Sequence, residues 1–174
     1  MSQSLSQLRK FVSPEIIFGA GCRHNVGNYA KTFGARKVLV VSDPGVIAAG
    51  WVADVEASLQ AQGIDYFLYS DVSPNPRVEE VMLGAELYRE NHCDVIVAVG
   101  GGSPMDCGKG IGIVVAHGRN ILEFEGVDTI RVPSPPLILI PTTAGTSADV
   151  SQFVIISNQQ ERMKFSIVSK AVVP

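Results

Sequence analysis

The stretch DVIVAVGGGSPMDCGKG, residues 94–110, decides the fold of this chain. Its first half is a continuous apolar run rich in β-branched residues, which is typical of a strand buried on both faces of a sheet. Three glycines, residues 100–102, follow at once, and then come Ser103, a good helix N-cap, and Pro104, which suits the first helical position. A buried strand that turns sharply into a helix is the building unit of a parallel α/β sheet.

The same alternation of strand and helix continues on both sides of this stretch. Short apolar runs predict four parallel strands, at residues 37–43, 64–69, 94–100 and 137–141. Apolar residues at helical spacing predict three helices, at residues 48–59, 77–91 and 103–117. Residues 153–157 and 163–168 flank a turn at Asn158 and predict a hairpin. The predicted fold class is α/β, a parallel sheet with flanking helices.

Composition excludes several classes of protein. The chain has 174 residues, 46% of them hydrophobic, and a formal charge of −3 from 14 basic and 17 acidic side chains. This composition excludes disorder and argues against nucleic-acid binding, and no apolar run is long enough to predict a membrane span or a secretory signal. Cys22, Cys93 and Cys107 are odd in number and widely spaced, so we expect reduced thiols and a cytoplasmic protein.

The glycine turn predicts an anion site. Glycines let the backbone turn sharply and approach a ligand closely, and the exposed N–H groups of a helix start attract negative charge. A pyrophosphate group is the expected ligand of this site. The alternative is a tight turn that binds no ligand. Asp106 stands three residues after Ser103, close to a capping box, and Lys109 is expected to form a surface ion pair with it. The spacing of the glycines fits neither G-x-G-x-x-G nor a Walker A loop.

Asp43 follows the strand at residues 37–43, at the carboxyl end of the predicted sheet. Its carboxylate could accept hydrogen bonds from both ribose hydroxyls of a dinucleotide and would repel a 2′-phosphate. The alternative is that Asp43 caps the helix that follows. The residues around it leave the two roles equally open.

Threonines follow the strand at residues 137–141. Thr142, Thr143 and Thr146 offer hydroxyls at a strand's carboxyl end, where open α/β sheets bind ligands. Beside the glycine turn they would form the other side of a nucleotide cleft. His24, His92 and His117 are scattered, so surface or capping roles are favoured over metal binding or acid–base chemistry for each.

Taken together, the motifs resemble the iron-containing (group III) alcohol dehydrogenase family, in the superfamily of glycerol dehydrogenase and dehydroquinate synthase. The motifs that carry the resemblance are FVSPEIIFGAG, VVSDPG, SPNP, GGGSPMDCGK, PTTAGTSAD and RMKFSIV. The resemblance implies a Rossmann-like dinucleotide-binding domain over residues 1–174 that includes an N-terminal β-hairpin at residues 11–21, and it implies that this domain binds NAD.

The resemblance also assigns roles to individual residues. Asp43 would face the adenosine ribose, Asn75 would lie near the adenine side, and Lys164 would reach the nicotinamide ribose. A set of residues at the glycine turn would cradle the pyrophosphate: Gly101, Gly102, Ser103, Pro104 and Met105. Thr142, Thr143 and Thr146 would line the opposite wall, and Asp106 would be a carboxylate near the cofactor.

The family's metal ligands, one Asp and three His, lie in and near a C-terminal all-helical domain. None of the four is expected within residues 1–174, so Fe²⁺ or Zn²⁺ is expected only in a full-length relative. The function implied is the NAD-binding domain of an enzyme that transfers hydride between a primary alcohol and NAD, with this chain inactive alone. A stand-alone nucleotide-binding or interaction module without catalysis, and a polyol dehydrogenase relative, are the alternatives.

The expected partners are a small alcohol or aldehyde in the full-length enzyme, and a second copy of the chain in a dimer or larger homo-oligomer. The second expectation comes from a C-terminal stretch rich in β-branched residues, which predicts an exposed apolar face. That stretch comprises Val154, Ile155, Ile156, Ile167, Val168, Val172 and Val173.

Overall fold

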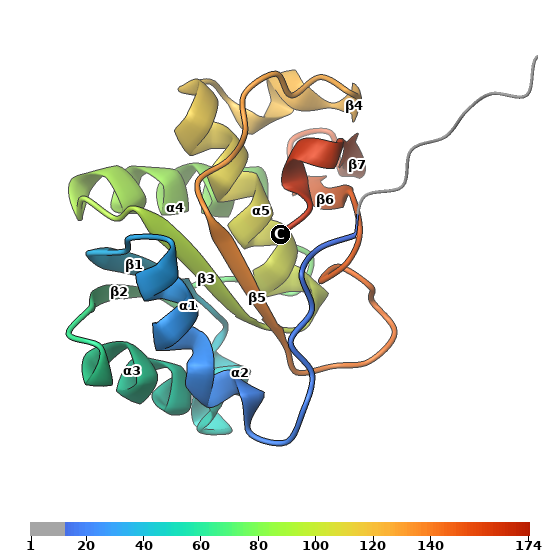
Figure 1. The fold of residues 1–174 in the computed structure, drawn as a ribbon. Coiled ribbons are helices and arrows are strands. Elements are labelled where there is room, and N and C mark those ends of the chain that lie inside the picture. The colour runs from blue at the N-terminus through green and yellow to red at the C-terminus, as the bar shows by residue number, and fades with distance from the viewer. Residues whose placement is uncertain (1–12) are drawn as a thin grey trace, which may run out of the picture.

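The computed structural model describes residues 13–174, and a parallel sheet with helices on both faces forms its centre (Figure 1). The strands of this sheet run in the order β2-β1-β3-β5. Their bounds are β1 Lys37–Val41, β2 Asp65–Tyr69, β3 Val95–Gly100 and β5 Leu137–Pro141. All three pairings are parallel, so the predicted α/β fold class is confirmed.

The predicted helices at residues 77–91 and 103–117 are confirmed to within one residue at each end, the predicted helix at residues 48–59 is divided into two shorter helices, and the helix at residues 26–32 was not predicted. Their bounds are α1 Val26–Thr32, α2 Pro44–Ala48, α3 Trp51–Ala61, α4 Val78–Glu90 and α5 Gly102–His117. A capping contact fixes the start of α4: the Glu80 carboxylate accepts a hydrogen bond of 3.0 Å from the backbone N–H of Arg77. That contact satisfies one of the free donors that every helix start carries.

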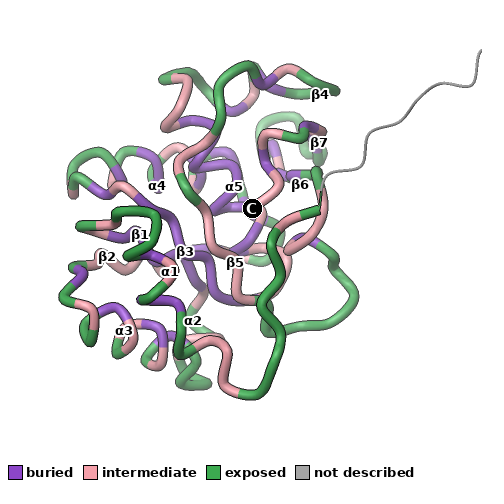
Figure 2. Tube along the Cα trace, in the orientation of Figure 1, coloured by how far each residue is buried: buried purple, intermediate pink, exposed green. Residues whose placement is uncertain are grey.

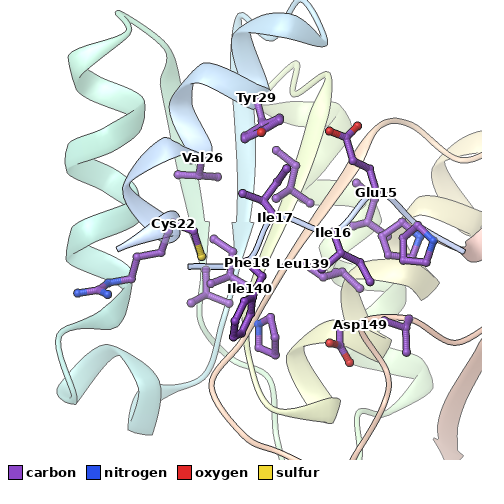
Figure 3. Close-up of a pocket in the computed structure, with 18 of the residues that line it drawn as sticks. Glu15, Ile16, Ile17, Phe18, Cys22, Val26, Tyr29, Leu139, Ile140 and Asp149 are labelled. Atoms are coloured by element: carbon purple, nitrogen blue, oxygen red, sulfur yellow. The ribbon is translucent and has the colours of Figure 1, made fainter. Parts of the chain in front are cut away.

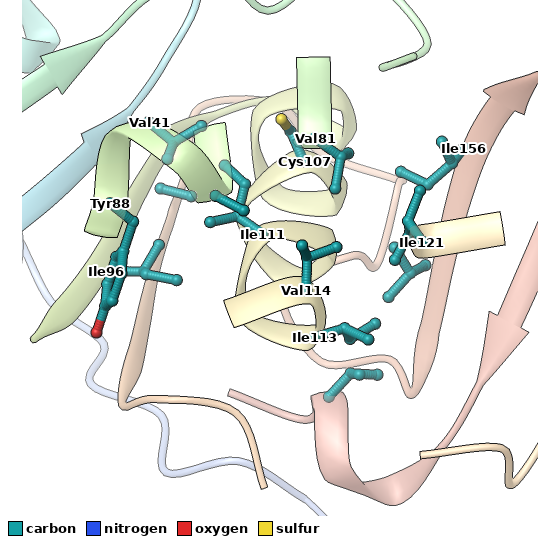
Figure 4. Close-up of a cluster of buried hydrophobic side chains, with 14 of the residues drawn as sticks. Val41, Val81, Tyr88, Ile96, Cys107, Ile111, Ile113, Val114, Ile121 and Ile156 are labelled. Atoms are coloured by element: carbon teal, nitrogen blue, oxygen red, sulfur yellow. The ribbon is translucent and has the colours of Figure 1, made fainter. Parts of the chain in front are cut away.

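The two central strands of the sheet are buried on both faces (Figure 2): β3 is buried at every position and β1 at every position after Lys37, whereas the outer strands β2 and β5 are mostly half-buried. Val38 and Val40 of β1 point into a cluster with α1 and α3. Leu39 and Val41 point to the other face, into a cluster with α4 and α5 that Figure 4 shows in close-up. The continuous apolar runs in the sequence thus correspond to strands covered on both sides.

A second, smaller sheet packs against α5. It contains β4 Gly126–Val127, β6 Phe153–Asn158 and β7 Met163–Val168, in the order β4-β7-β6. Strands β6 and β7 are antiparallel and form the predicted hairpin, whereas β4 was not predicted because it is only two residues long.

The expectation of an exposed apolar face formed by the β-branched residues between Val154 and Val173 is wrong in part. Four of its side chains are buried with an exposed fraction of 1% or less: Val154, Ile156, Ile167 and Val172. Strand alternation explains this, because neighbouring residues point to opposite faces and one face packs on α5. Phe153, Ile155 and Met163 are the large apolar residues of the hairpin that remain exposed.

The expected N-terminal hairpin is not formed by the described residues of that segment. Residues 11 and 12 lie outside the described part, and residues 13–18 contain no strand. Pro14 has no N–H to contribute to a ladder, and Gly19 and Gly21 turn the chain into the short 3-10 helix Cys22–Asn25. The segment instead runs along the open edge of β5, with Phe18 98% exposed.

The glycines inside α5 allow close packing, which offsets their weak helix propensity. A Cβ on Gly108 would lie 3.0 Å from Cβ of Ala98 in β3, and one on Gly110 would lie 3.0 Å from Val81 in α4. Each glycine weakens a helix by about 1 kcal/mol relative to alanine. The short distances show that α5 lies nearer to the sheet and to α4 than side chains would permit.

The contact of α1 with α3 yields a prediction about stability. A Cβ on Gly27 would lie 2.2 Å from the backbone oxygen of Ser58, so Gly27→Ala must force the two helices apart. We expect it to lower the free energy of unfolding by about 2 kcal/mol or more, measured by urea denaturation. The control is Asn28→Ala at the exposed neighbouring position, which should change stability by less than about 0.5 kcal/mol. Equal effects of the two substitutions would contradict the packing described here.

Candidate nucleotide-binding site

The turn from β3 into α5 has the properties of an anion site. Gly100 has φ 148°, and a Cβ there would lie 2.7 Å from Cγ of Pro104, so the turn requires glycine at this position. Helix α5 begins at Gly102 with Gly101 as its N-cap, and no side chain caps it. The first N–H groups of this 16-residue helix therefore have no capping partner among the described residues and can bind a negatively charged ligand.

Ser103 is not the helix cap that the sequence predicted. Because α5 starts one residue earlier, Ser103 lies within its first turn, and its Oγ accepts a hydrogen bond of 3.0 Å from the backbone N–H of Asn75. The side-chain Oδ1 of Asn75 accepts a hydrogen bond of 2.6 Å from Nζ of Lys164 in β7. The helix start, the loop before α4 and the hairpin thus meet at one place.

The threonine loop after β5 lies directly against the glycine turn. The backbone N–H of Thr142 donates to the Gly100 carbonyl at 2.9 Å. The Thr143 Oγ1 atom lies 3.2 Å from where a Cβ on Gly101 would stand, and Thr146 approaches Gly102 in the same way. The structure brings together the two loops that the sequence placed on opposite walls, with all three threonines exposed.

Asp43 caps α2. Its Oδ1 accepts a hydrogen bond of 3.0 Å from the backbone N–H of Val46, which is the capping alternative considered from the sequence. The same residue lies at the carboxyl end of β1, next to β3, and Ser42 Oγ donates to the Val99 carbonyl at 2.9 Å across the two strands. Asp43 is therefore at the sheet edge that carries the glycine turn, and its Oδ2 has no hydrogen-bond partner in the described part of the chain.

Met105 and Pro104 are buried, so their side chains support the turn from beneath. Asp106 is partly buried, and burial raises the pKa of its carboxyl group to about 6, with the Lys109 charge and the backbone N–H of Ile155 acting in the opposite direction. Asp106 is thus a partly buried carboxylate, and it does not form a capping box with Ser103.

The predicted surface ion pair of Lys109 is wrong. Lys109 is 1% exposed, and its Nζ donates to the backbone oxygens of Ser151 at 2.8 Å and Phe153 at 3.2 Å. Burial lowers the pKa of Lys109 to about 8, while Asp106 and Asp149 favour its charged form. The close packing that the glycines on either side of it allow turns this side chain inward, which spacing along the sequence did not reveal.

A hollow of about 700 Å³ lies along the open edge of β5, and sequence reasoning missed it (Figure 3). Its walls are the N-terminal segment, α1 and the apolar strand β5, with Ile16 and Phe18 close to Leu139 and Ile140 in the figure. Of the predicted cofactor residues only Thr142 lines it. The hollow is largely apolar, and none of the three glycines of the turn lines it, although Thr142 and Asp149 do.

His117 has a structural role. Its Nδ1 lies 2.9 Å from the Ile113 carbonyl, and Nε2 accepts from the backbone N–H of Val132 at 3.3 Å. Within residues 13–174 no three His, Cys, Asp or Glu side chains come together as a metal site. Over the same residues, no helix combines the length and the apolar character that a membrane crossing needs. All three cysteines are free thiols.

Comparison with known proteins identifies the family of this chain. A family profile described as iron-containing alcohol dehydrogenase matches residues 13–174. The chain belongs to this family. It is 40% identical over 158 residues to alcohol dehydrogenase 4 of Schizosaccharomyces pombe, a match that covers 91% of this chain and 37% of the yeast protein.

Two solved structures show the same fold. A structure of 1,3-propanediol oxidoreductase superposes with a TM-score of 0.93 at 36% identity and covers 97% of this chain and 44% of that one. The sulfoacetaldehyde reductase of Bifidobacterium kashiwanohense, solved in complex with NAD⁺, has a TM-score of 0.84 at 30% identity and covers 97% and 45%. This iron-containing alcohol dehydrogenase chain thus spans about two fifths of the length of the relatives it matches.

The raised pKa of Asp106 predicts a pH dependence of stability. Between its ordinary pKa of 3.8 and its folded value of about 6, the folded state holds a proton that the unfolded state has lost. Raising the pH from 4 to 6 should therefore destabilise the unmodified protein relative to Asp106→Asn, by about 2 kcal/mol at about 1.4 kcal/mol per pKa unit.

The measurement is the free energy of unfolding in urea at several pH values for both proteins. Glu123→Gln is the control of opposite sign, because the hydrogen bond from Arg119 lowers the pKa of Glu123. The unmodified protein should gain stability relative to that variant as the pH rises. A difference between the unmodified protein and Asp106→Asn that does not change with pH would contradict the burial of this carboxyl group.

Proposed function

We propose that this chain is the NAD-binding part of an alcohol dehydrogenase that transfers hydride between a small primary alcohol or aldehyde and NAD. One observation carries the proposal: the uncapped start of α5, with its free N–H groups, lies beside Asn75, Lys164 and the threonine loop, all of which contribute polar groups. A helix N-terminus of this kind suits a pyrophosphate. NAD, when bound, supplies the hydride acceptor, and the chain's residues bind and orient it.

The geometry suggests how the residues share this task. The N–H groups of Gly102 and Ser103 would donate to the pyrophosphate oxygens, and the hydroxyls of Thr143 and Thr146 would close the cleft from the side. Asn75 and Lys164 are bonded to each other beside Ser103, which does not fit the opposite ends of the dinucleotide that the resemblance assigned to them. We therefore place both near the middle of the dinucleotide, where the Lys164 ammonium would offset phosphate charge. Asp43 would accept from the adenosine ribose through Oδ2 while Oδ1 keeps its cap.

The relatives support the proposal. The reductase solved with NAD⁺ shares the fold over 97% of this chain. The yeast alcohol dehydrogenase and the propanediol oxidoreductase are named for activity on small alcohols, which is the substrate class proposed for the enzyme to which this chain corresponds.

The proposal also covers the cellular compartment and the oligomeric state of the protein. Free thiols at Cys22, Cys93 and Cys107 fit a reducing compartment, and we propose the cytoplasm. The apolar hollow beside β5 and the exposed Phe153, Ile155 and Met163 support self-association into a homo-oligomer.

The choice between NAD and NADP tests the proposal. The unmodified chain should bind NAD at least about tenfold more tightly than NADP, because the Asp43 carboxylate repels a 2′-phosphate with like charge, at a cost of about 1–3 kcal/mol. Asp43→Asn keeps an oxygen for the Val46 N–H and removes the charge, so it should narrow the preference by about tenfold at unchanged stability.

Calorimetric titration of both cofactors into both proteins is the measurement. Glu56→Gln, at a partly exposed position on α3, is the control for loss of one negative charge and should leave the preference unchanged. Absence of NAD binding to the unmodified chain would overturn the proposed function. Equal affinities for NAD and NADP would overturn the role of Asp43.

A further inference from the structure

Lys109 is a buried cation that neither the family motifs nor the cofactor contacts explain. It lies in the second turn of α5, seven residues after Gly102, with 1% of its surface exposed. An ammonium group loses its hydration on burial and needs compensating partners. Its partners are the backbone oxygens of Ser151 and Phe153, at 2.8 and 3.2 Å.

These two carbonyls stand where the threonine loop ends. Ser151 precedes β6, and Phe153 is the first residue of that strand. The other end of the loop is held by the hydrogen bond from the Thr142 N–H to the Gly100 carbonyl at 2.9 Å. One end of residues 142–152 is thus held by a backbone hydrogen bond to the glycine turn. The other end is held by Lys109 of α5, together with the hydrogen bond of 2.9 Å from the Ser169 N–H to the Gln152 carbonyl.

The loop between these two attachments has little other support. Its residues from Thr142 to Ser147 are exposed, and the hydrogen bonds recorded within it are long: 3.4 Å from the Ala148 N–H to Thr146 Oγ1 and 3.2 Å from the Val150 N–H to the Ser147 carbonyl. Ser147 also has φ 54°, a left-handed conformation that L-residues adopt reluctantly. Such a loop keeps one conformation only if its ends are fixed.

We propose that Lys109 is a positioning residue for the cofactor: by binding the Ser151 and Phe153 carbonyls it holds Thr143 and Thr146 against the glycine turn in the conformation that receives the dinucleotide. Lys109 does not touch the ligand. It lowers the conformational entropy that the loop must lose on binding, which is the general advantage of a preorganised site. The inference rests on the proposed NAD site, but its effect on the loop exists without any ligand.

The test is Lys109→Met, which keeps the length and apolar stem of the side chain and removes the donor. We expect hydrogen exchange of the amides of residues 143–150 to become at least tenfold faster in the free protein, with little change in α4 or β3. NAD should bind at least about tenfold more weakly at a temperature well below the melting point of the variant.

The matched control is Ile111→Val on the same helix, whose side chain faces Gly84 of α4 and not the loop. It should lower the melting temperature while leaving loop exchange and NAD affinity within about twofold of the unmodified protein. A purely structural role of Lys109 would make both variants behave alike, with faster exchange everywhere and unchanged NAD affinity, and that result would overturn the inference.

If Lys109→Met does not fold, Lys109→Gln replaces it. Its amide donors stand on a stem one bond shorter than that needed to reach both carbonyls, so loop exchange and NAD affinity should still be impaired, and values equal to those of the unmodified protein would overturn the inference. If the unmodified chain binds no NAD, the proposed function fails, and the exchange comparison alone still decides whether Lys109 holds the loop.

Discussion

The hydrogen bond from the Thr142 N–H to the Gly100 carbonyl fixes the geometry on which the candidate site depends. It extends the pairing of β3 with β5 by one residue beyond the last paired positions, Gly100 and Pro141. As a result the glycine turn and the threonine loop leave the sheet side by side at its carboxyl edge, where open α/β sheets bind ligands. The turn can be this tight because Gly100 adopts a conformation in which any side chain would collide with Pro104.

A second constraint follows from the first. Helix α5 starts directly at the end of β3 and must lie close to the sheet, and Gly108 and Gly110 provide that closeness. The helix therefore carries Asp106 and Lys109 into the interior, beneath the threonine loop. The close packing of α5 on the sheet thus places the helix start at the proposed anion site and also buries Lys109 where it can bind the end of the threonine loop.

The fold followed from the sequence because strand and helix periodicities along the chain are strong and consistent. The run at Val95–Gly100 was recognisable as a strand, and so was the hairpin of β6 and β7. The two-residue strand β4 carries no periodicity, and the N-terminal segment was expected as a hairpin although Pro14 removes a ladder donor. Both differences arise where pairing depends on distant residues and not on the local sequence.

The candidate site was predictable in its residue types but not in its contacts. Glycines, threonines and Asp43 were expected at strand ends, and the structure places them there. The bond between Lys164 and Asn75 joins residues 89 positions apart, and the burial of Lys109 depends on how closely α5 packs. Neither leaves a signal in spacing. Helix α5 also begins one residue earlier than predicted, so Ser103 lies in its first turn and is not its N-cap.

The start of α5 and the threonine loop form the dinucleotide site that we propose. Titration of NAD into the ¹⁵N-labelled chain, followed by amide chemical shifts, tests it most directly. We expect the largest changes in amide chemical shift at Gly102, Ser103, Thr143 and Thr146, with small changes at Ile16 and Phe18 in the hollow beside β5. Largest shifts in the hollow, with the glycine turn unaffected, would contradict it.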